Sequence, residues 1–459
     1  MNFPLDDTIA AIATPPGEGG LCIIRMSGLK SYAIADQVFR GSSLPSKCKS
    51  HTVLYGKIKE PGSNLTIDEV LLSILRAPRT YTREDIVEIS GHGGYVTGRR
   101  ILDLLIINGA RHADPGEFTK RAFVNGRIDL VQAEAVAELI RARTDASARS
   151  AIRQLGGHFS SDIVDLRLRI LSVLALIEVG IDFTEEGIKE IETGHILNLL
   201  ITIRSDLSDI YNNALKYKVL RDGLRIAIVG KPNVGKSTLL NIILDRNRAI
   251  VDPSPGTTRD TIEEMMDLDG IPVTFIDTAG IHRSSDPVET QGIIRAQAEI
   301  QSSDLVLVVF DGSSQLTQDD FHFMKSISHN RLFVVFNKSD IATKARIHHF
   351  EKAGQYKFIY ISARTGEGVD ALKNLIVHSV ISDETNFESD ILLNSRQQEH
   401  LHIALAKLSI GINIIGNEEG SEIAAIEIRD VAYHLGSIIG LEIGDEILDL
   451  VFSQFCIGK

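Results

Sequence analysis

The chain has 459 residues, enough for about three domains if each takes roughly 150 residues. Its formal net charge is −13, which excludes a surface that attracts nucleic acid as a whole, so RNA contact needs a local basic patch or a basic partner. The three cysteines lie far apart, which excludes a disulfide framework and a paired-cysteine zinc site and fits a reducing cytosol. The N-terminus has no pattern of a secretory signal, and the longest apolar stretch, residues 170–181, is too short to span a bilayer.

The first segment, residues 1–118, mixes short β-like runs with turns rich in Gly and Pro. Residues 10–14, 21–25, 70–75 and 85–89 are predicted strands. This mixture predicts an α+β domain.

The second segment, residues 119–220, carries apolar side chains at helical spacing and no strong strand signal. The same periodicity returns in residues 379–459. We expect the two segments to form one all-α helical domain, because a domain can be inserted into another when its two ends lie close together.

Between them, residues 221–378 alternate strands with helices. The predicted strands are near-continuous apolar runs, at 224–229, 273–276, 305–310, 332–336 and 358–361. Such runs are typical of strands buried on both faces of a mostly parallel sheet. The segment therefore predicts an inserted α/β nucleotide-binding domain.

A glycine-rich sequence, Gly-Lys-Pro-Asn-Val-Gly-Lys-Ser at 230–237, follows the first of these strands and precedes a helix. In that context it predicts a P-loop, whose backbone N–H groups surround phosphates at a helix N-terminus. Lys236 is expected to reach the β- and γ-phosphates, and the Ser237 hydroxyl to bind magnesium. A structural glycine-rich turn is the alternative for this motif alone.

Three further motifs follow in order: Asp-Thr-Ala-Gly at 277–280, Asn-Lys-Ser-Asp at 337–340 and Ser-Ala at 362–363. Asp277 can hold magnesium through water, and Asp340 can accept hydrogen bonds from the N1–H and 2-amino groups of guanine, a donor pair that adenine lacks. Each motif alone could be an ordinary polar turn. All four together predict a P-loop GTPase that binds GTP with Mg²⁺.

The residue after Asp-Thr-Ala-Gly is Ile281, so the glutamine that orients water in Ras-like switches is absent from that position, and no arginine finger is identifiable. Asn233 offers a neutral side-chain oxygen, and the loop 252–260 offers backbone carbonyls. Neutral oxygens suit a monovalent cation. For Asn233, a loop-stabilising role is the alternative.

The whole chain resembles the MnmE (TrmE) family, the GTPases that modify the wobble uridine of certain tRNAs. The resemblance rests on Ala-Thr-Pro-Pro-Gly-Glu-Gly-Gly at 13–20, Val-Glu-Ile-Ser-Gly-His-Gly-Gly at 87–94, the stretch 114–135, Pro-Gly-Thr-Thr-Arg-Asp at 255–260, and Phe-Cys-Ile-Gly-Lys at 455–459. It implies an N-terminal domain that binds tetrahydrofolate and forms a homodimer, a helical domain, and an inserted GTPase domain.

The resemblance also implies the residues around the nucleotide. Potassium would be held by Asn233, Asp252, Ser254 and Thr257, and magnesium by Ser237 and Thr258. Glu289 would position the attacking water, although a solvated surface charge is its other interpretation. The expected GTP contacts are Asn233, Val234, Gly235, Lys236, Ser237, Thr238, Asp252, Pro253, Ser254, Pro255, Gly256, Thr257, Thr258, Asp277, Thr278, Ala279, Gly280, Asn337, Lys338, Ser339, Asp340, Ser362, Ala363 and Arg364.

The folate site implied by the resemblance consists of Arg25, Glu88, Arg127 and Lys459. A carboxylate such as Glu88 suits the amino-pyrimidine edge of a pterin, and Arg or Lys suits its glutamate tail. Cys456 would lie near the one-carbon group and counts, with Glu289 and Lys236, among the candidate catalytic residues. An inert thiol is the alternative for Cys456.

The family implies a cytoplasmic enzyme that works with an MnmG-type FAD protein, in a heterotetramer or larger complex, on tRNA. Together they would add a carboxymethylaminomethyl or aminomethyl group to C5 of the wobble uridine. The carbon would come from 5,10-methylenetetrahydrofolate, for which a 5-formyl analogue can stand in, and the amine from glycine or ammonium. A ribosome-assembly GTPase and a free-standing folate-dependent one-carbon transferase are the alternatives.

Overall fold

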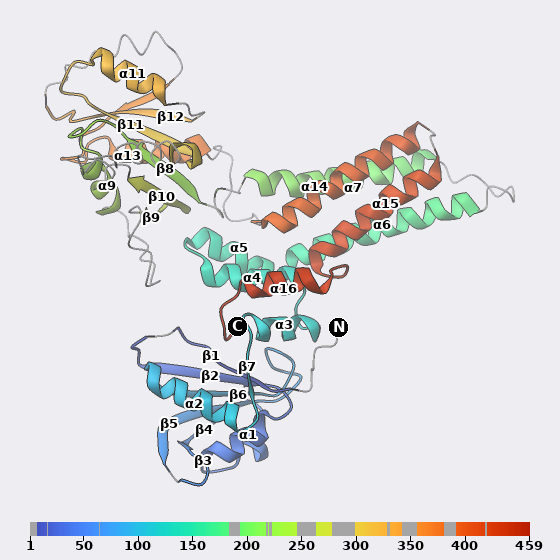
Figure 1. The fold of residues 1–459 in the computed structure, drawn as a ribbon. Coiled ribbons are helices and arrows are strands. Elements are labelled where there is room, and N and C mark those ends of the chain that lie inside the picture. The colour runs from blue at the N-terminus through green and yellow to red at the C-terminus, as the bar shows by residue number, and fades with distance from the viewer. Residues whose placement is uncertain are drawn as a thin grey trace, which may run out of the picture. The chain divides into compact units, whose positions relative to one another are not determined.

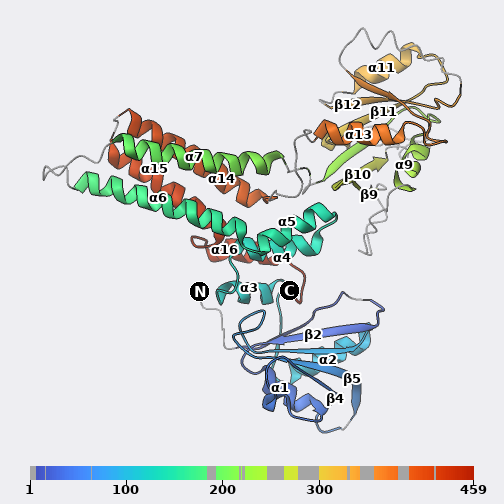
Figure 2. The ribbon, with the colours of Figure 1, turned by 180° about the vertical axis from the view of Figure 1, so that it is seen from behind.

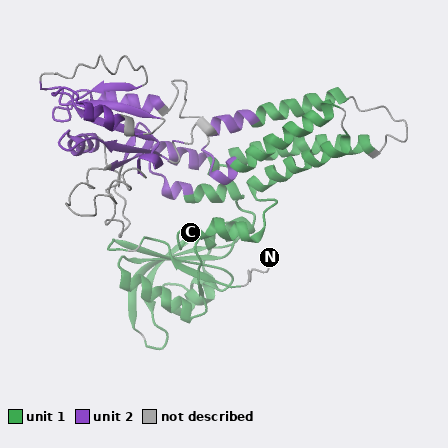
Figure 3. Cartoon of the chain, turned by 45° about the horizontal axis from the view of Figure 1, so that its top comes forward, with its two compact units in different colours: residues 1–137, 154–207, 399–459 green, residues 138–153, 208–398 purple. Residues whose placement is uncertain are grey.

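The computed structural model describes residues 7–15, 17–63, 65–182, 193–216, 219, 223–245, 263–277, 299–327, 331–341, 356–380, 392–417 and 420–459. The chain forms two compact units, which Figure 3 colours separately. Unit 1 comprises Met1–Ala137, Gln154–Leu207 and Glu399–Lys459, and unit 2 comprises Glu138–Arg153 and Ser208–Gln398. In the part of the chain that is described, no helix has both the length and the apolar character needed to cross a membrane.

Unit 1 begins with a seven-stranded sheet in the order β3-β4-β5-β6-β2-β1-β7. The strands are β1 (Ile9–Ile12), β2 (Leu21–Ser27), β3 (Phe39–Gly41), β4 (Thr52–Lys59), β5 (Thr66–Leu75), β6 (Ile86–His92) and β7 (Arg111–His112). All neighbours are antiparallel except β1 and β7.

One face of this sheet is covered by α1 (Ser31–Val38) and α2 (Tyr95–Ile107), as Figure 1 shows, and a short 3-10 helix spans Pro45–Lys47. The alternation along β5 explains the packing: Val70, Leu72 and Ile74 are buried in the core below the helices, while Leu71 is exposed. The predicted α+β domain is confirmed.

The rest of unit 1 is helical. It contains α3 (Glu117–Val124), the first part of α4 (Leu130–Arg141), α6 (His158–Asp182), most of α7 (Thr193–Lys216) and of α14 (Ser395–Gly416), α15 (Ser421–Ile439) and α16 (Asp445–Ser453). The long helices α6, α7, α14 and α15 run side by side in Figures 1 and 2. The α15 helix packs along α6 through an apolar stripe that includes Ala424, Ile428, Val431 and Leu435, which lie three or four residues apart. Segments before and after the inserted domain therefore form one helical bundle, as predicted.

Unit 2 is built on a six-stranded sheet in the order β13-β12-β11-β8-β10-β9. Its elements are α5 (Asp145–Leu155), β8 (Leu224–Val229), α9 (Lys236–Asp245), β9 (Glu263–Leu268), β10 (Ile271–Asp277), β11 (Leu305–Asp311), α11 (Gln318–Ser326), β12 (Leu332–Asn337), β13 (Lys357–Tyr360) and α13 (Val369–Val380). All strands are parallel except β9, which pairs antiparallel with β10. The α/β class is confirmed, but β9 was not predicted, because its Glu-Glu start lacks the apolar run that marks a central strand.

The parallel strands direct their carboxyl ends to one edge of the sheet, where ligands bind in open α/β folds. Three predicted motifs follow or end these strands, at 230–237 after β8, at 337–340 at the end of β12 and at 362–363 after β13, and Asp277, the described residue of the fourth motif, ends β10. The topology thus brings them to the same edge.

Candidate functional site

The P-loop lies between β8 and α9 and approaches the end of β12 closely. Gly235 has a φ of +95°, and a Cβ atom built on it would lie 2.2 Å from Asn337 Nδ2. Only glycine meets both conditions, because a side chain is disfavoured at this φ and has no room. Gly235 therefore allows the loop and the Asn-Lys-Ser-Asp motif to pack against each other.

Lys236 is buried, with 7% of its surface exposed, and its Nζ donates to the carbonyl oxygens of Gly230 at 2.8 Å and Lys231 at 2.9 Å. An ammonium group in a buried loop needs such partners. Ser237 and Thr238 are exposed in the first turn of α9, where helix N–H groups and the helix dipole favour an anion. This donor set, a lysine with a hydroxyl at a helix N-terminus, fits a magnesium-bound triphosphate.

Asn337 joins two motifs to the P-loop. Its side chain is buried, its Nδ2 donates to Val234 O at 2.8 Å, and its Oδ1 accepts from Ala363 N at 2.8 Å. These bonds give Asn337 a role in positioning the loops, and the ligand contact expected from the sequence stays a prediction. The next residue, Lys338, forms an ion pair with Asp311 at the end of β11, at 2.5 Å.

Asp340 lies beside the Ser-Ala motif. Its Oδ1 accepts from Ser362 Oγ at 2.7 Å, and its Oδ2 pairs with Arg364 Nη2 at 2.8 Å. The hydrogen bond from Ser362 lowers the pKa of Asp340 and, with the charge of Arg364, outweighs burial, which acts to raise it. The carboxylate is therefore ionised, and its remaining lone pairs can accept from a base edge. Arg364 is 78% exposed at its side chain and can be displaced by a ligand.

Several predicted residues lie outside the described residues, namely Asp252, Pro253, Ser254, Pro255, Gly256, Thr257, Thr258, Thr278, Ala279, Gly280 and Glu289. For Asp277 the backbone is described, at the end of β10. The structure thus brings together the P-loop, the Asn-Lys-Ser-Asp motif and the Ser-Ala motif, and Asn233 lies exposed on the P-loop with a φ of +64°.

A second cluster lies in unit 1, where Arg25 of β2 is directly opposite Glu88 of β6. Arg25 Nε and Glu88 Oε1 are 2.7 Å apart, and their side chains are 18% and 25% exposed. The other carboxylate oxygen of Glu88 has no partner among the described residues. Arg25 Nη1 also donates to Gly458 O, at 3.3 Å. The cluster therefore offers an available acceptor beside a cation, which suits the amino-pyrimidine edge of a pterin.

The segment 455–459 packs onto the N-terminal domain. Gly458 has a φ of +93°, and a Cβ on it would lie 2.5 Å from Ile12 O. Phe118 N donates to Lys459 O at 3.2 Å. Burial lowers the pKa of Lys459, as does the charge of Arg25, against the opposing effect of Glu88. Lys459 is thus held in the electrostatic neighbourhood of the Arg25–Glu88 pair.

Tyr81 connects Arg127 to this cluster. The guanidinium carbon of Arg127 lies 4.7 Å from the centre of the Tyr81 ring, and that of Arg25 lies 5.8 Å from it. The Tyr81 hydroxyl bonds with Thr119 Oγ1 at 2.9 Å, which fixes the ring. Sequence reasoning missed Tyr81, and its only signal was an aromatic residue in a loop with Arg79 and Arg83. The fifth predicted group, the Cys456 thiol, is exposed.

Comparisons with known proteins identify the family. The chain matches the family model "MnmE helical domain" over residues 130–456 and "GTP-binding protein TrmE N-terminus" over 8–127. It is 41% identical over 456 residues to the tRNA modification GTPase MnmE of Acetivibrio thermocellus, covering 99% of each chain. It is 43% identical over 456 residues to that of Lacticaseibacillus paracasei, covering 99% of this chain and 98% of the relative. It is 42% identical over 460 residues to that of Carboxydothermus hydrogenoformans, covering 99% of this chain and 100% of the relative. The chain belongs to the MnmE (TrmE) family of tRNA modification GTPases.

Proposed function

We propose that this GTPase hydrolyses GTP with Mg²⁺, is stimulated by K⁺, and couples hydrolysis to modification of the wobble uridine of tRNA. An MnmG-type FAD protein would be its partner, in a heterotetramer or larger complex, and the product would carry a carboxymethylaminomethyl or aminomethyl group at C5. We place this activity in the cytoplasm and in a homodimer that pairs through the N-terminal domains. Tetrahydrofolate would supply the carbon, and glycine or ammonium the amine.

One observation carries the proposal: a single chain combines a P-loop site with a pterin-type cluster. The two contain different chemistry, phosphate donors around Lys236 in one and an acceptor beside a cation at Glu88 and Arg25 in the other. A GTPase that acts only as a switch has no use for the second cluster, and a folate-dependent transferase has no use for the first. Enzymes that couple nucleotide hydrolysis to one-carbon chemistry need both.

In the nucleotide site, Lys236 would neutralise charge that develops on the phosphates, and Ser237 with Thr258 would hold Mg²⁺. The residues proposed to hold K⁺ are Asn233, Asp252, Ser254 and Thr257. Bound there, K⁺ would supply the positive charge that an arginine finger supplies elsewhere. Glu289 would orient the attacking water. The left-handed backbone of Asn233, exposed on the P-loop, supports its part in this proposal, because strained non-glycine residues gather at functional sites.

In the folate site, Glu88 would accept hydrogen bonds from the amino-pyrimidine edge, while Arg25 holds the carboxylate in place through its 2.7 Å bond. Lys459 and Arg127 would contact the carboxylates of the glutamate tail. Cys456 would stand near the one-carbon unit.

The test of the proposed function is nucleoside analysis of tRNA from cells that lack this protein. We expect the C5-modified wobble uridine to disappear and to return when the chain is supplied. The Lys236→Ala variant should fail to restore it, whereas Lys49→Ala, which changes an exposed lysine in the N-terminal domain, should succeed. Unchanged nucleosides together with incomplete ribosomal particles would instead favour a ribosome-assembly GTPase.

Potassium dependence tests the nucleotide site separately. Hydrolysis by the purified chain should be much faster in potassium chloride than in sodium chloride at the same ionic strength. Equal rates in the two salts would remove the cation from the mechanism.

A further inference from the structure

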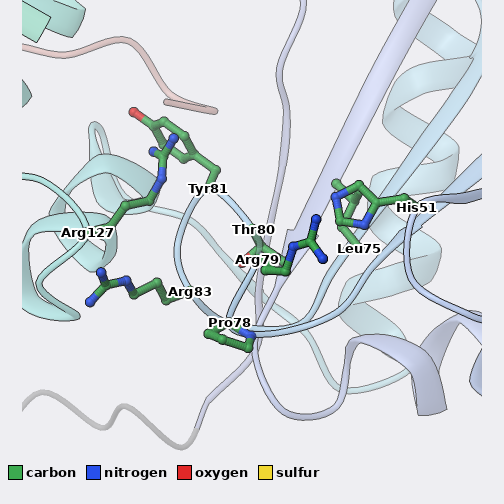
Figure 4. Close-up of a pocket in the computed structure, with 8 residues that line it drawn as sticks. All are labelled: His51, Leu75, Pro78, Arg79, Thr80, Tyr81, Arg83 and Arg127. Atoms are coloured by element: carbon green, nitrogen blue, oxygen red, sulfur yellow. The ribbon is translucent and has the colours of Figure 1, made fainter. Parts of the chain in front are cut away.

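A basic pocket adjoins the Arg25–Glu88 cluster in unit 1. Its volume is about 410 Å³, within the range of small-molecule sites. Four of its eight lining residues are His51, Arg79, Arg83 and Arg127, and none of the eight is acidic. Figure 4 shows Arg127 beside the Tyr81 ring, with Arg79 farther along the loop that carries Tyr81 and His51 on a separate segment beyond Arg79. The lining thus favours an anionic ligand.

Hydrogen bonds of buried residues hold the backbone of the loop that carries Arg79, Tyr81 and Arg83. Thr82 is fully buried, its hydroxyl bonds with Ser27 Oγ at 2.7 Å, and its carbonyl accepts from Asn125 Nδ2 at 2.7 Å. A bond of 2.6 Å from Thr80 Oγ1 to Glu84 O closes the turn. The basic side chains are therefore presented on a preorganised backbone, which lowers the entropic cost of binding.

The positive charges of the pocket are not neutralised locally. The nearest carboxylates in sequence are engaged elsewhere: Glu84 pairs with Arg121 at 3.1 Å, and Asp85 accepts from Ala77 N at 3.0 Å. Among the described residues, no carboxylate forms an ion pair with Arg79 or Arg127, and both are exposed. These guanidinium groups can bind carboxylates of a ligand, often through paired hydrogen bonds.

Two residues of the basic pocket have a strained, left-handed backbone. The described residues include five non-glycine residues with positive φ, and two of them, Asn233 and Lys338, belong to the nucleotide motifs. Two others, His51 at +62° and Arg83 at +60°, line the basic pocket. Strained residues of this kind persist where the surrounding structure enforces them, and they gather at ligand sites.

We propose that this pocket binds the γ-linked polyglutamate extension of the folate cofactor. The inference rests on the proposed folate site, because Tyr81 and Arg127 belong to both. Each added glutamate contributes one carboxylate. The pocket is lined by Arg127, Arg83 and Arg79, so successive carboxylates of the extension could each meet an arginine. RNA phosphates share the charge of this ligand, but a pocket of about 410 Å³ next to the Arg25–Glu88 cluster, in a chain of net charge −13, favours the small anion.

The experiment compares 5-formyltetrahydrofolate with its γ-linked triglutamate by titration calorimetry on the full chain at low salt. We expect the triglutamate to bind about tenfold more tightly, because its extra carboxylates can pair with exposed arginines that form no ion pair among the described residues. The advantage should shrink as salt is added. The double variant Arg79→Gln, Arg83→Gln should lose this advantage while it binds the monoglutamate normally. Arg100→Gln, which removes an exposed arginine from α2 of the same domain, should retain it.

Equal affinity of the native chain for the two folates, or an advantage that survives in the double variant, would overturn the inference and leave the folate site intact. A native chain that binds neither folate would overturn the folate site itself, and this inference with it. A double variant that binds both folates like the native chain but binds tRNA more weakly would assign the arginines to RNA.

Discussion

Replacing Gly458 by alanine should detach residues 456–459 from the Arg25–Glu88 cluster while leaving the nucleotide site intact. Alanine at a φ of +93° costs about 1–2 kcal/mol. Its Cβ would also meet Ile12 O at 2.5 Å, a backbone atom that has little room to move. The opposing interactions are three hydrogen bonds, Arg25 to Gly458 O, Phe118 N to Lys459 O and Gly116 N to Cys456 O, worth about 1 kcal/mol each.

The strain is thus comparable with the interactions that dock the segment, and the undocked state becomes populated. If the docked fraction falls to about a tenth, the apparent folate affinity falls about tenfold. Titration with 5-formyltetrahydrofolate measures this, and basal GTP hydrolysis should be unchanged because the P-loop belongs to unit 2.

Gly444→Ala is the matched control, since Gly444 has a φ of −74° and no atom within 4 Å of its Cβ position. Equal folate affinity in the two glycine variants would refute the reasoning.

Three other predictions concern charge and hydrogen bonding. Asn337→Ala should lower nucleotide affinity at least tenfold and reduce the melting temperature. The change leaves the buried Val234 carbonyl and the buried Ala363 N–H unpaired, at a cost of about 1–3 kcal/mol each. Titration with a fluorescent nucleotide measures the affinity, and thermal denaturation measures the melting temperature. Asp340→Asn should weaken GTP binding about 10²- to 10⁴-fold, and an unaltered guanine preference would contradict the assigned role. Arg121→Met should reduce the free energy of unfolding by about 3–5 kcal/mol in urea titrations, because Glu84 loses its cation while Asp7 and Glu117 keep only Arg111. In the native chain, burial acts to raise the pKa of Asp7 and of Glu117, but hydrogen bonds from arginines outweigh it and lower both pKa values. The two carboxylates therefore stabilise the fold above their ordinary pKa values of 3.8 and 4.5, and this stabilisation is lost on further acidification. The Arg121→Met variant should lose less stability over that range in an acid titration.

The elements of the nucleotide-binding domain could be predicted because their signals are local. A buried parallel strand appears in the sequence as an apolar run, and the P-loop is a contiguous motif between a strand and a helix. Residues 224–237 alone are therefore enough to predict the strand β8 and the P-loop that follows it. The edge strand β9 escaped because edge strands tolerate charge on their exposed positions.

What the sequence could not give were contacts between distant segments. The role of Asn337 depends on the register that brings it to Val234, 103 residues earlier. The link through Tyr81 depends on where Arg127 projects from the turn after α3. Arg25 and Glu88 were named from a family resemblance, and the structure supplies the reason for their pairing, which is that they occupy opposite positions on adjacent strands.

The double attachment of Asn337 has a consequence for how nucleotides leave. One amide group ties the loop that receives the phosphates to the segment that receives the base. When one end of the ligand comes loose, the restraint on the other end weakens too, so we expect departure as a concerted event without a long-lived half-bound intermediate. If the binding free energy of the intact nucleotide were shared between its base and its phosphates, each fragment would bind with its own share. We expect guanosine alone, or triphosphate alone, to bind far more weakly than that share predicts.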